Sequence, residues 1–182
     1  SRHSWLAMSD DDDDQGGGAR VVFRDFTPEH EDALRKLNAV IFPIRYSDKF
    51  YVECAAAGSA TQLAFVEDVL VGAIACRLEL LPDRSAAKLY VMTVGVLAPY
   101  RDKQIGTRLL THSLNFAFAD PFVTEVYLHV QVNNLDAISF YTKKFGFIQQ
   151  GVALHYYKRL EPPDAAVLAL DLSKKRKSCP AS

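Results

Sequence analysis

A glycine and several basic side chains lie together between residues 100 and 110, which read Y-R-D-K-Q-I-G-T-R-L-L. A strand-like apolar run precedes this segment, and from Gln104 onward apolar residues recur at helical spacing. The N-terminus of a helix carries N–H groups without partners and the positive end of the helix dipole, so it binds phosphate. Gly106 would allow close approach of the backbone, and Arg101 and Lys103 add positive charge. The segment is therefore a phosphate-binding loop or a charged turn before a helix.

A second motif combines Asn134 and Tyr141 with a Phe-Gly-Phe turn at residues 145–147. Asn134 is a favourable N-cap residue, and the glycine of the turn is typical of the position that follows a helix. Taken alone, this motif predicts a capped amphipathic helix over residues 134–144.

Two side chains that exchange protons lie on predicted strands. Tyr90 belongs to the apolar run 89–97, and His129 belongs to the alternating segment 125–131. A histidine titrates near neutral pH and can act as a general base. Neighbouring strands would bring both residues to one side of the sheet. Each also suits a structural role, His129 as a core histidine with satisfied hydrogen bonds and Tyr90 as an aromatic side chain on a half-buried sheet.

These motifs belong to an alternation of strand and helix patterns. Strands are expected at 21–26, 62–66, 69–81, 89–97, 125–131, 147–150 and 164–170. Helices are expected at 28–41, at 48–57, from 104 onward and at 134–144. The order β-α-α-β-β-β-α-β-α-β-β predicts an α/β fold with a mixed central sheet of about seven strands and about four helices on both faces.

The composition is that of one globular domain with tails. Of the 182 residues, 49% are hydrophobic and 24% are charged, which suits a full-sized core. No apolar run approaches the roughly 18 residues that span a bilayer. The net charge of −1 gives no reason to expect DNA or a membrane as a direct partner. The three cysteines lack metal-ligand spacing, so we expect no metal site, no disulfide framework and a reducing compartment.

Both ends of the chain differ from the middle in composition. Residues 1–19 hold five consecutive aspartates and three glycines, so we expect a disordered acidic tail. Residues 1–7 are interpreted as a remnant, with Met8 as the candidate natural start. Residues 173–182 carry the cluster K-K-R-K and are interpreted as a basic tail that is a solubilising terminus, a nuclear-import patch or an RNA-contacting arm. The expected location is the cytoplasm, with the nucleus as a second compartment.

The loop and the Asn134 motif, in this order and separation, resemble the GNAT family of acetyl-CoA-dependent N-acetyltransferases. That family carries R/Q-x-x-G-x-G/A after its fourth strand and N-x-x-A-x-x-x-Y, followed by G-F, around its fourth helix. The resemblance covers roughly residues 20–172 and narrows to the subfamily of NatE catalytic subunits. It rests on F-P-I-R-Y from residue 42, L-Y-V-M-T from 89, L-A-P-Y-R from 97, Y-L-H-V-Q from 127 and Y-Y-K-R-L-E-P from 156.

The resemblance implies N-terminal acetylation of proteins that begin with Met followed by an apolar residue. The α-amine attacks acetyl-CoA directly in a ternary complex, and Tyr90 and His129 act as base through ordered water. Tyr141 faces the thioester sulfur. The implied acetyl-CoA-binding residues are Val94, Val96, Arg101, Asp102, Lys103, Gln104, Ile105, Gly106, Thr107, Asn134 and Tyr141. The implied substrate-binding residues are Phe42, Pro43, Ile44, Tyr46, Met92, Tyr156, Tyr157 and Leu160.

A weak base suffices for this chemistry. An α-amine has a pKa of about 7.7–8.0, whereas that of lysine is about 10.4. Deprotonation at neutral pH therefore costs on the order of 1 kcal/mol for the α-amine and roughly 4–5 kcal/mol for lysine. A histidine or a water-linked tyrosine is adequate for the first, so this chemistry favours an α-amine substrate.

The sequence departs from the family pattern at two places. Gln104 stands where the family has its first glycine, and Asp102 adds a carboxylate nearby. Either the backbone at Gln104 is helical and tolerates the side chain, or it is left-handed and weakens the cofactor site. In addition, one residue is inserted between Tyr141 and the Phe-Gly-Phe turn. A bulge or a longer helix end could absorb it and leave Tyr141 in place, or the insertion could rotate the turn.

Two other functions fit parts of the sequence. A degraded loop would suit a weakly active or non-catalytic subunit that docks on the ribosome-associated NatA complex, the partner that the resemblance implies. A basic tail would suit a lysine (histone) acetyltransferase. Retention of Tyr90, His129, Asn134 and Tyr141 favours an active enzyme, and the walled pocket around Phe42 favours an N-terminal over a lysine substrate.

Overall fold

A seven-stranded sheet organises residues 18–179, the part of the chain that this computed structural model describes. The strand order is β1-β2-β3-β4-β5-β7-β6. Only β4 and β5 pair in parallel, and the other neighbours are antiparallel. The strands are β1 (Val21–Asp25), β2 (Gln62–Val66), β3 (Val69–Leu80), β4 (Ala87–Val96), β5 (Val123–Gln131), β6 (Ile148–Ala153) and β7 (Ala165–Asp171). The predicted mixed α/β sheet is confirmed.

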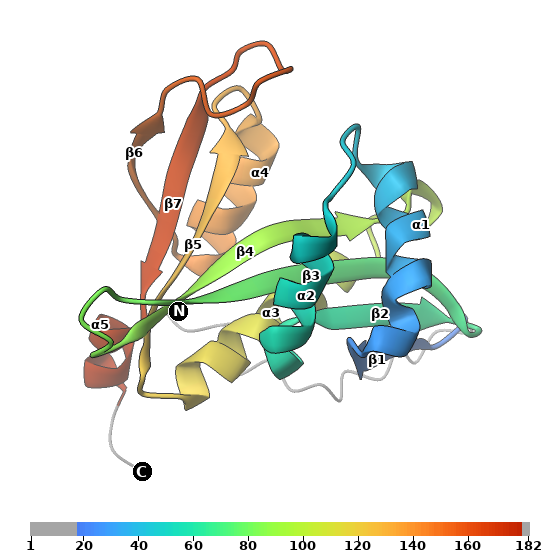
Figure 1. The fold of residues 1–182 in the computed structure, drawn as a ribbon, viewed down its shortest axis with the longest axis horizontal. Helices are drawn as coiled ribbons and strands as arrows, with labels where there is room; N and C mark the ends of the chain where they lie inside the picture. The colour runs from blue at the N-terminus through green and yellow to red at the C-terminus, as the bar shows by residue number, and fades with distance from the viewer. Residues whose placement is uncertain (1–17, 180–182) are drawn as a thin grey trace.

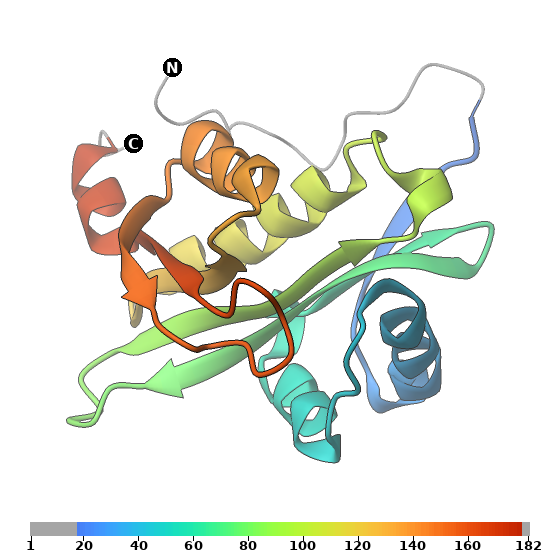
Figure 2. The ribbon, with the colours of Figure 1, turned by 90° about the horizontal axis from the view of Figure 1, so that it is seen from above.

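Helices cover both faces of the sheet, as Figure 2 shows from above. Helices α1 and α2 lie on one face, and α3 and α4 lie on the other. The helices are α1 (Glu31–Ile41), α2 (Asp48–Ala56), α3 (Ile105–Ala119), α4 (Leu135–Ser139) and α5 (Leu172–Ser178).

Each face has its own core. On the first, Leu34 of α1 and Phe50 of α2 pack with Leu63 of β2. On the second, Leu109 and Leu114 of α3 belong to a larger buried cluster with residues of the sheet. Full burial of such a side chain contributes roughly 1.5–3 kcal/mol, so the helical spacing of these residues holds the helices against the sheet.

Strands β4 and β5 separate partway along their length. Their parallel ladder runs from Ala87 to Tyr90 of β4, and Tyr90 opposite Tyr127 is the last pair. Beyond Tyr90, β4 continues to Val96 with β3 as its ladder partner. Figure 1 shows β5 diverging from β4 over this stretch. Backbone groups on the open side of β4 are therefore available to a ligand.

Helix α5 was not expected from the sequence, which indicated only a basic tail. The Asp171 carboxylate accepts a hydrogen bond from the Lys174 N–H at 3.0 Å and caps the helix. The guanidinium of Arg176 donates to the carbonyl oxygens of Ala117, Phe118 and Asp120 at 2.8–3.1 Å. These carbonyls end α3, where a cation is favourable. One basic residue of the predicted tail, Arg176, thus fastens the C-terminal end of α3.

The other elements agree with the predicted ranges to within a few residues. The predicted disorder of residues 1–19 concerns a segment that, except for residues 18 and 19, lies outside the described residues. Across residues 18–179, no helix is both long enough and apolar enough to cross a membrane. Within the same range, no group of three or more His, Cys, Asp or Glu side chains could hold a metal ion.

Candidate active site

Tyr90 and His129 meet where β4 and β5 begin to separate. The Tyr90 hydroxyl oxygen lies 2.9 Å from His129 Nδ1 and 2.8 Å from the Tyr156 hydroxyl oxygen. The rings of His129 and Tyr156 stack with centroids 4.1 Å apart. Tyr127 faces Tyr90 across the ladder, and His129 follows two residues later on the same strand face. The three side chains Tyr156, Tyr90 and His129 form one hydrogen-bonded chain, called the proton chain below.

Partial burial shifts the pKa values of Tyr90 and His129 in opposite directions. Burial, reinforced by the hydrogen bond to Tyr156, raises the pKa of Tyr90 far above its ordinary value. Burial lowers the pKa of His129, and the nearby Glu79 carboxylate opposes this effect only in part. At neutral pH Tyr90 is therefore a neutral phenol, and His129 is a neutral imidazole that can accept a proton. Of the two residues predicted to act as base, His129 is the one whose neutral form can accept a proton, and Tyr90 suits a relay.

Two charged residues of β3 support the proton chain, and neither was predicted from the sequence. The Arg77 guanidinium carbon lies 4.7 Å from the centroid of the Tyr90 ring, and Arg77 pairs with Glu79 at 2.8 Å. The Tyr127 hydroxyl donates a hydrogen bond to Glu79. The charges in Arg77-Leu78-Glu79 alternate with period two, which places both on one strand face. That pattern was the available signal for a polar network beside Tyr90.

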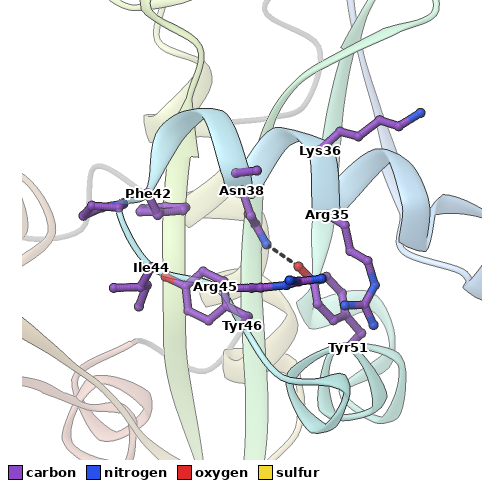
Figure 3. A pocket seen from close by; sticks show the side chains of 10 residues that line it. Arg35, Lys36, Asn38, Phe42, Ile44, Arg45, Tyr46 and Tyr51 are labelled. Carbon is purple, nitrogen blue, oxygen red and sulfur yellow. Dashed lines mark hydrogen bonds between the residues drawn. The ribbon is translucent and has the colours of Figure 1, made fainter.

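A cavity of about 640 Å³ lies between α1 and the segment that follows it (Figure 3). Phe42 and Tyr46 meet edge to face with centroids 6.0 Å apart, and Tyr46 stacks on Phe50 at 4.4 Å. Burial raises the pKa of Tyr46 to about 12, and nearby Tyr156 and Tyr157 add to the shift. Tyr46, which lines the cavity, therefore lies within electrostatic range of Tyr156 in the proton chain. Its lining comprises Arg35, Lys36, Asn38, Ala39, Phe42, Pro43, Ile44, Arg45, Tyr46 and Tyr51.

The loop before α3 has left-handed backbone at two positions that are not glycine. Gln104 has φ 61° and ψ 12°, and Asp102 has φ 64°. This conformation costs a residue with a Cβ atom roughly 1–2 kcal/mol. The sequence left two backbone conformations open for Gln104. The structure has the left-handed one, so the alternative prediction of a helical backbone is wrong. The loop keeps the geometry that a glycine would adopt without strain.

The first turn of α3 presents free amides to a second cavity, of about 320 Å³. The first hydrogen bond within the helix runs from the Arg108 N–H to the Gln104 carbonyl at 2.9 Å. The three preceding amides have no acceptor within the helix and can bind an anion. This cavity is lined by Val96, Tyr100, Arg101, Asp102, Gln104, Ile105, Gly106, Thr107, Phe140 and Lys144.

A π-helical turn absorbs the residue inserted after Tyr141. Helix α4 continues into this turn, Phe140–Lys144, and the Thr142 hydroxyl donates to the Ile138 carbonyl at 2.8 Å. A π-turn accommodates one extra residue within a helix. Tyr141 packs edge to face on Phe140 and Phe147, with centroids 5.2 and 5.7 Å away. Of the alternatives that the sequence left open for the inserted residue, the bulge is the one found.

Comparison with known proteins identifies the family. The model of the acetyltransferase (GNAT) family matches residues 23–147. The chain belongs to the GNAT family. Probable N-acetyltransferase san of Drosophila melanogaster is 46% identical over 150 residues, covering 82% of this chain and 80% of the fly protein. N-alpha-acetyltransferase 50 of Danio rerio is 44% identical over 153 residues, covering 84% of this chain and 89% of the fish protein.

Solved GNAT structures agree with this assignment. Arabidopsis thaliana Naa50 in complex with the bisubstrate analogue CoA-Ac-MVNAL superposes with a TM-score of 0.77 at 46% identity. The match covers 83% of this chain and 98% of the plant protein. Arabidopsis thaliana NAA60 in complex with acetyl-CoA has a TM-score of 0.72 at 22% identity and supports the fold alone. The GNAT fold and the resemblance to NatE catalytic subunits are confirmed.

The GNAT site brings most, but not all, of the predicted cofactor residues to the loop cavity. Val96, Arg101, Asp102, Gln104, Ile105, Gly106 and Thr107 line it. Val94, Lys103, Asn134 and Tyr141 lie outside this lining. The side-chain oxygen of Asn134 accepts a hydrogen bond from the Ala137 N–H at 3.2 Å as N-cap, which leaves its amide nitrogen free to donate to a ligand.

The predicted substrate residues divide into two groups. Phe42, Pro43, Ile44 and Tyr46 line the larger cavity, whereas Met92, Tyr156, Tyr157 and Leu160 do not. Tyr156 belongs to the proton chain, and Tyr157 meets it edge to face with centroids 4.9 Å apart. Met92 packs at the margin of the core beneath α1 and α2, and Leu160 is exposed.

Gly95 shapes the cavity wall from the strand below it, although the sequence did not single it out. A Cβ atom at Gly95 would lie 2.9 Å from Cζ of Phe42 and 3.0 Å from Cγ2 of Ile41. We expect Gly95→Ala to displace the Phe42 ring and to lower the free energy of unfolding by about 1–3 kcal/mol, as overpacking does. Urea unfolding measures this change.

Gly151 provides the matched control for this substitution. A Cβ atom there would meet nothing within 4 Å, so Gly151→Ala should change the free energy of unfolding by less than about 0.5 kcal/mol. Equal stabilities for the two alanine variants would contradict a tight contact between Gly95 and Phe42.

Proposed function

We propose that this protein is an acetyl-CoA-dependent N-alpha-acetyltransferase that acts on N termini beginning with Met followed by an apolar residue. One observation carries the proposal: a proton chain that ends on a neutral histidine lies near a cavity whose lining includes aromatic and aliphatic side chains. The relatives support the chemistry, because one is an N-alpha-acetyltransferase and another was solved with an analogue that joins CoA to the peptide MVNAL.

The loop cavity fits the phosphate end of acetyl-CoA. Three free amides at the start of α3, together with the Arg101 guanidinium, suit an anion. The open backbone of β4 at Val94 and Val96 can hydrogen-bond an extended amide chain, although the Val96 carbonyl also accepts from Arg101 Nε at 3.0 Å. Acetyl-CoA, when bound, supplies an acetyl group activated as a thioester.

The proton chain removes the proton that the amine loses as its bond to the acetyl carbon forms. The proton passes through water to Tyr156 and Tyr90, and it comes to rest on His129. Each hydroxyl gives up one proton as it receives another, so only the imidazole changes charge. Tyr90 need not ionise, which its strongly raised pKa would oppose.

Tyr141 suits stabilisation of the leaving sulfur. Burial raises the pKa of Tyr141 to about 12, so its hydroxyl stays protonated at neutral pH and can donate a hydrogen bond. The carbon–sulfur bond breaks with its electron pair on sulfur, and a donor directed at that thiolate stabilises the developing charge. Solvent then protonates the thiolate and regenerates neutral His129.

The larger cavity selects the side chain of the first residue. Phe42, Pro43 and Ile44 offer apolar surface for a methionine side chain, and the Tyr46 hydroxyl can bond a peptide backbone. The proton chain is suited to an α-amine, whose deprotonation at neutral pH costs less than that of lysine by roughly 3 kcal/mol. We therefore favour N termini over lysine side chains.

The cellular setting is part of the same proposal. The catalytic domain is proposed to associate with subunits of NatA and, through them, with the ribosome. The exposed lysines Lys174 and Lys177 of α5 supply a basic surface that suits contact with RNA. Cys54 and Cys76 are free and buried, which is compatible with the cytoplasm as the main location and the nucleus as a second one.

Turnover on short peptides tests this proposal. We expect acetyl-CoA to raise the melting temperature of the protein and a peptide beginning Met-Leu to be acetylated. The same peptide beginning Met-Lys should show a kcat/KM at least about 10-fold lower, because a charged second residue would be costly to desolvate beside a cavity that already carries Arg35, Lys36 and Arg45. Absence of both stabilisation and turnover would contradict an enzyme and leave the docking subunit.

A further inference from the structure

Lys144 reaches the cofactor loop from the other side of the loop cavity. Its ammonium nitrogen lies 3.0 Å from the side-chain oxygen of Gln104 and 3.0 Å from the hydroxyl oxygen of Thr107. Both partners belong to the segment that begins α3, whereas Lys144 ends the π-helical turn after α4. Lys144 thus joins two elements across the opening in which the free amides of α3 lie.

The charge of Lys144 is not neutralised by the protein. Among residues 18–179, no ion pair involves Lys144. An ammonium group has three donors, and its two observed acceptors are neutral oxygens. One donor and the full positive charge remain at a cavity that already presents free amides. Asp102 lines the same cavity, and its carboxylate disfavours an anion there without forming an ion pair with Lys144.

The inserted residue accounts for this position of Lys144. Each residue of an α-helix turns the next side chain by roughly 100°, so an inserted residue would rotate every side chain after it. A π-turn confines this change to the side chains of the turn itself. Here the π-helical turn spans Phe140–Lys144 itself. Tyr141, before the insertion, keeps its aromatic packing, and Lys144, at the end of the turn, faces the loop. The two departures from the family pattern, at Gln104 and after Tyr141, are therefore in direct contact.

We propose that Lys144 binds a phosphate group of acetyl-CoA and that the Gln104 side chain holds Lys144 in place for it. This inference rests on the proposed function. Gln104 then has a positive role, because its amide oxygen positions a cation that a glycine at the same place could not hold. A positioned ammonium beside free amides is an arrangement that binds phosphate strongly.

Calorimetric titration with acetyl-CoA tests the role of Lys144. We expect Lys144→Met to raise the Kd for acetyl-CoA by about 10-fold, the effect of losing one charge-assisted hydrogen bond. The matched control is Lys143→Met, which removes the same charge from the neighbouring exposed residue and should leave Kd unchanged. The kcat/KM for S-acetyl-pantetheine, which lacks every phosphate, should be the same in wild type and Lys144→Met.

The role of Gln104 is tested by a second pair of variants. Gln104→Ala keeps a Cβ atom at the left-handed position and removes only the amide, so it should raise the Kd for acetyl-CoA by about 3-fold. In the Lys144→Met background the same change should have no effect. Each variant must melt, without ligand, within a few degrees of wild type to be compared.

Two results would overturn the inference. One is a Lys144→Met protein that binds acetyl-CoA as tightly as wild type. The other is an equal loss for Lys144→Met with acetyl-CoA and with S-acetyl-pantetheine, which would mean that Lys144 supports the fold of the site and not a phosphate. A wild-type protein that binds no acetyl-CoA would instead overturn the proposed function itself.

Discussion

Replacing His129 by alanine is expected to lower kcat on a Met-Leu peptide by about 100-fold to 1,000-fold at pH 7. The imidazole is the group of the proton chain that can accept a proton near neutral pH, because burial lowers the pKa of His129 and raises that of Tyr90. The alanine variant must release the amine proton to bulk water. Steady-state rates with both substrates saturating measure the loss, and the KM for acetyl-CoA should change little.

The loss in His129→Ala is expected to depend on pH. Since the pKa of His129 lies below its ordinary value of about 6.5, wild-type kcat should hold at neutral pH and fall as pH drops through that lowered pKa. The base also removes the proton that a protonated α-amine must lose before it attacks, and at pH 9, above the α-amine pKa of about 7.7–8.0, this first deprotonation is no longer needed. The deficit should therefore shrink between pH 7 and pH 9. A deficit that stays constant would show that His129 only supports the structure.

Two further variants distinguish loss of the proton relay from damage to the fold. Tyr90→Phe keeps the ring and removes the hydroxyl that joins His129 to Tyr156, so kcat should fall by about 10-fold to 100-fold. His112→Ala removes a histidine of α3 that lies outside both cavity linings, and activity should be unchanged. Full activity in Tyr90→Phe would exclude the proton chain as the route of the proton.

Replacing Phe42 by alanine is expected to lower kcat/KM for the Met-Leu peptide by about 10-fold to 100-fold. The Phe42 ring lines the larger cavity and rests on Tyr46 and against the backbone at Gly95. Its removal deletes apolar contact with a bound side chain and leaves a void, at a cost of roughly 1.5–3 kcal/mol. The Kd for acetyl-CoA, measured by calorimetry, should stay within about 2-fold of wild type.

The control for Phe42→Ala lies two residues earlier in the chain, on α1. Val40 is 74% exposed, so Val40→Ala removes apolar surface from α1 without touching the cavity. Its kcat/KM should match wild type. If Phe42→Ala also matched wild type for the Met-Leu peptide, or lost equally for a peptide beginning with alanine, the cavity would not be the binding site of the methionine side chain.

The spacing of apolar residues predicted the helices and strands of this fold, because helices and strands that pack on a core bury residues at different, characteristic spacings. Of the apolar residues of α1 at 3–4 spacing, Leu34 and Leu37 are buried, whereas Val40 is 74% exposed. The alternation in β5 placed His129 opposite to the buried Val130, as observed. Tyr90 and His129 could therefore be assigned to one face of the sheet from local pattern and the family motif.

The rest of the site depends on contacts between segments distant in sequence. The tight approach of Phe42 to Gly95, and of Lys144 to Gln104, arises only when α1, the loop and the π-helical turn are packed on the sheet. The backbone conformation of Gln104 could not be predicted from the sequence either, because glutamine usually avoids the left-handed region that it adopts here. Helix α5 was missed because a run of basic residues reads as a solvated tail, whereas Arg176 uses the free carbonyls at the end of α3.

The central claim, transfer of an acetyl group to the α-amine of a peptide, is tested most directly by locating the acetyl group. A peptide that begins Met-Leu and carries one internal lysine is incubated with acetyl-CoA and the protein, and the product is fragmented by tandem mass spectrometry. We predict one acetyl group on the α-amine and none on the lysine. Acetylation of the lysine, or an unmodified peptide despite bound acetyl-CoA, would contradict the claim.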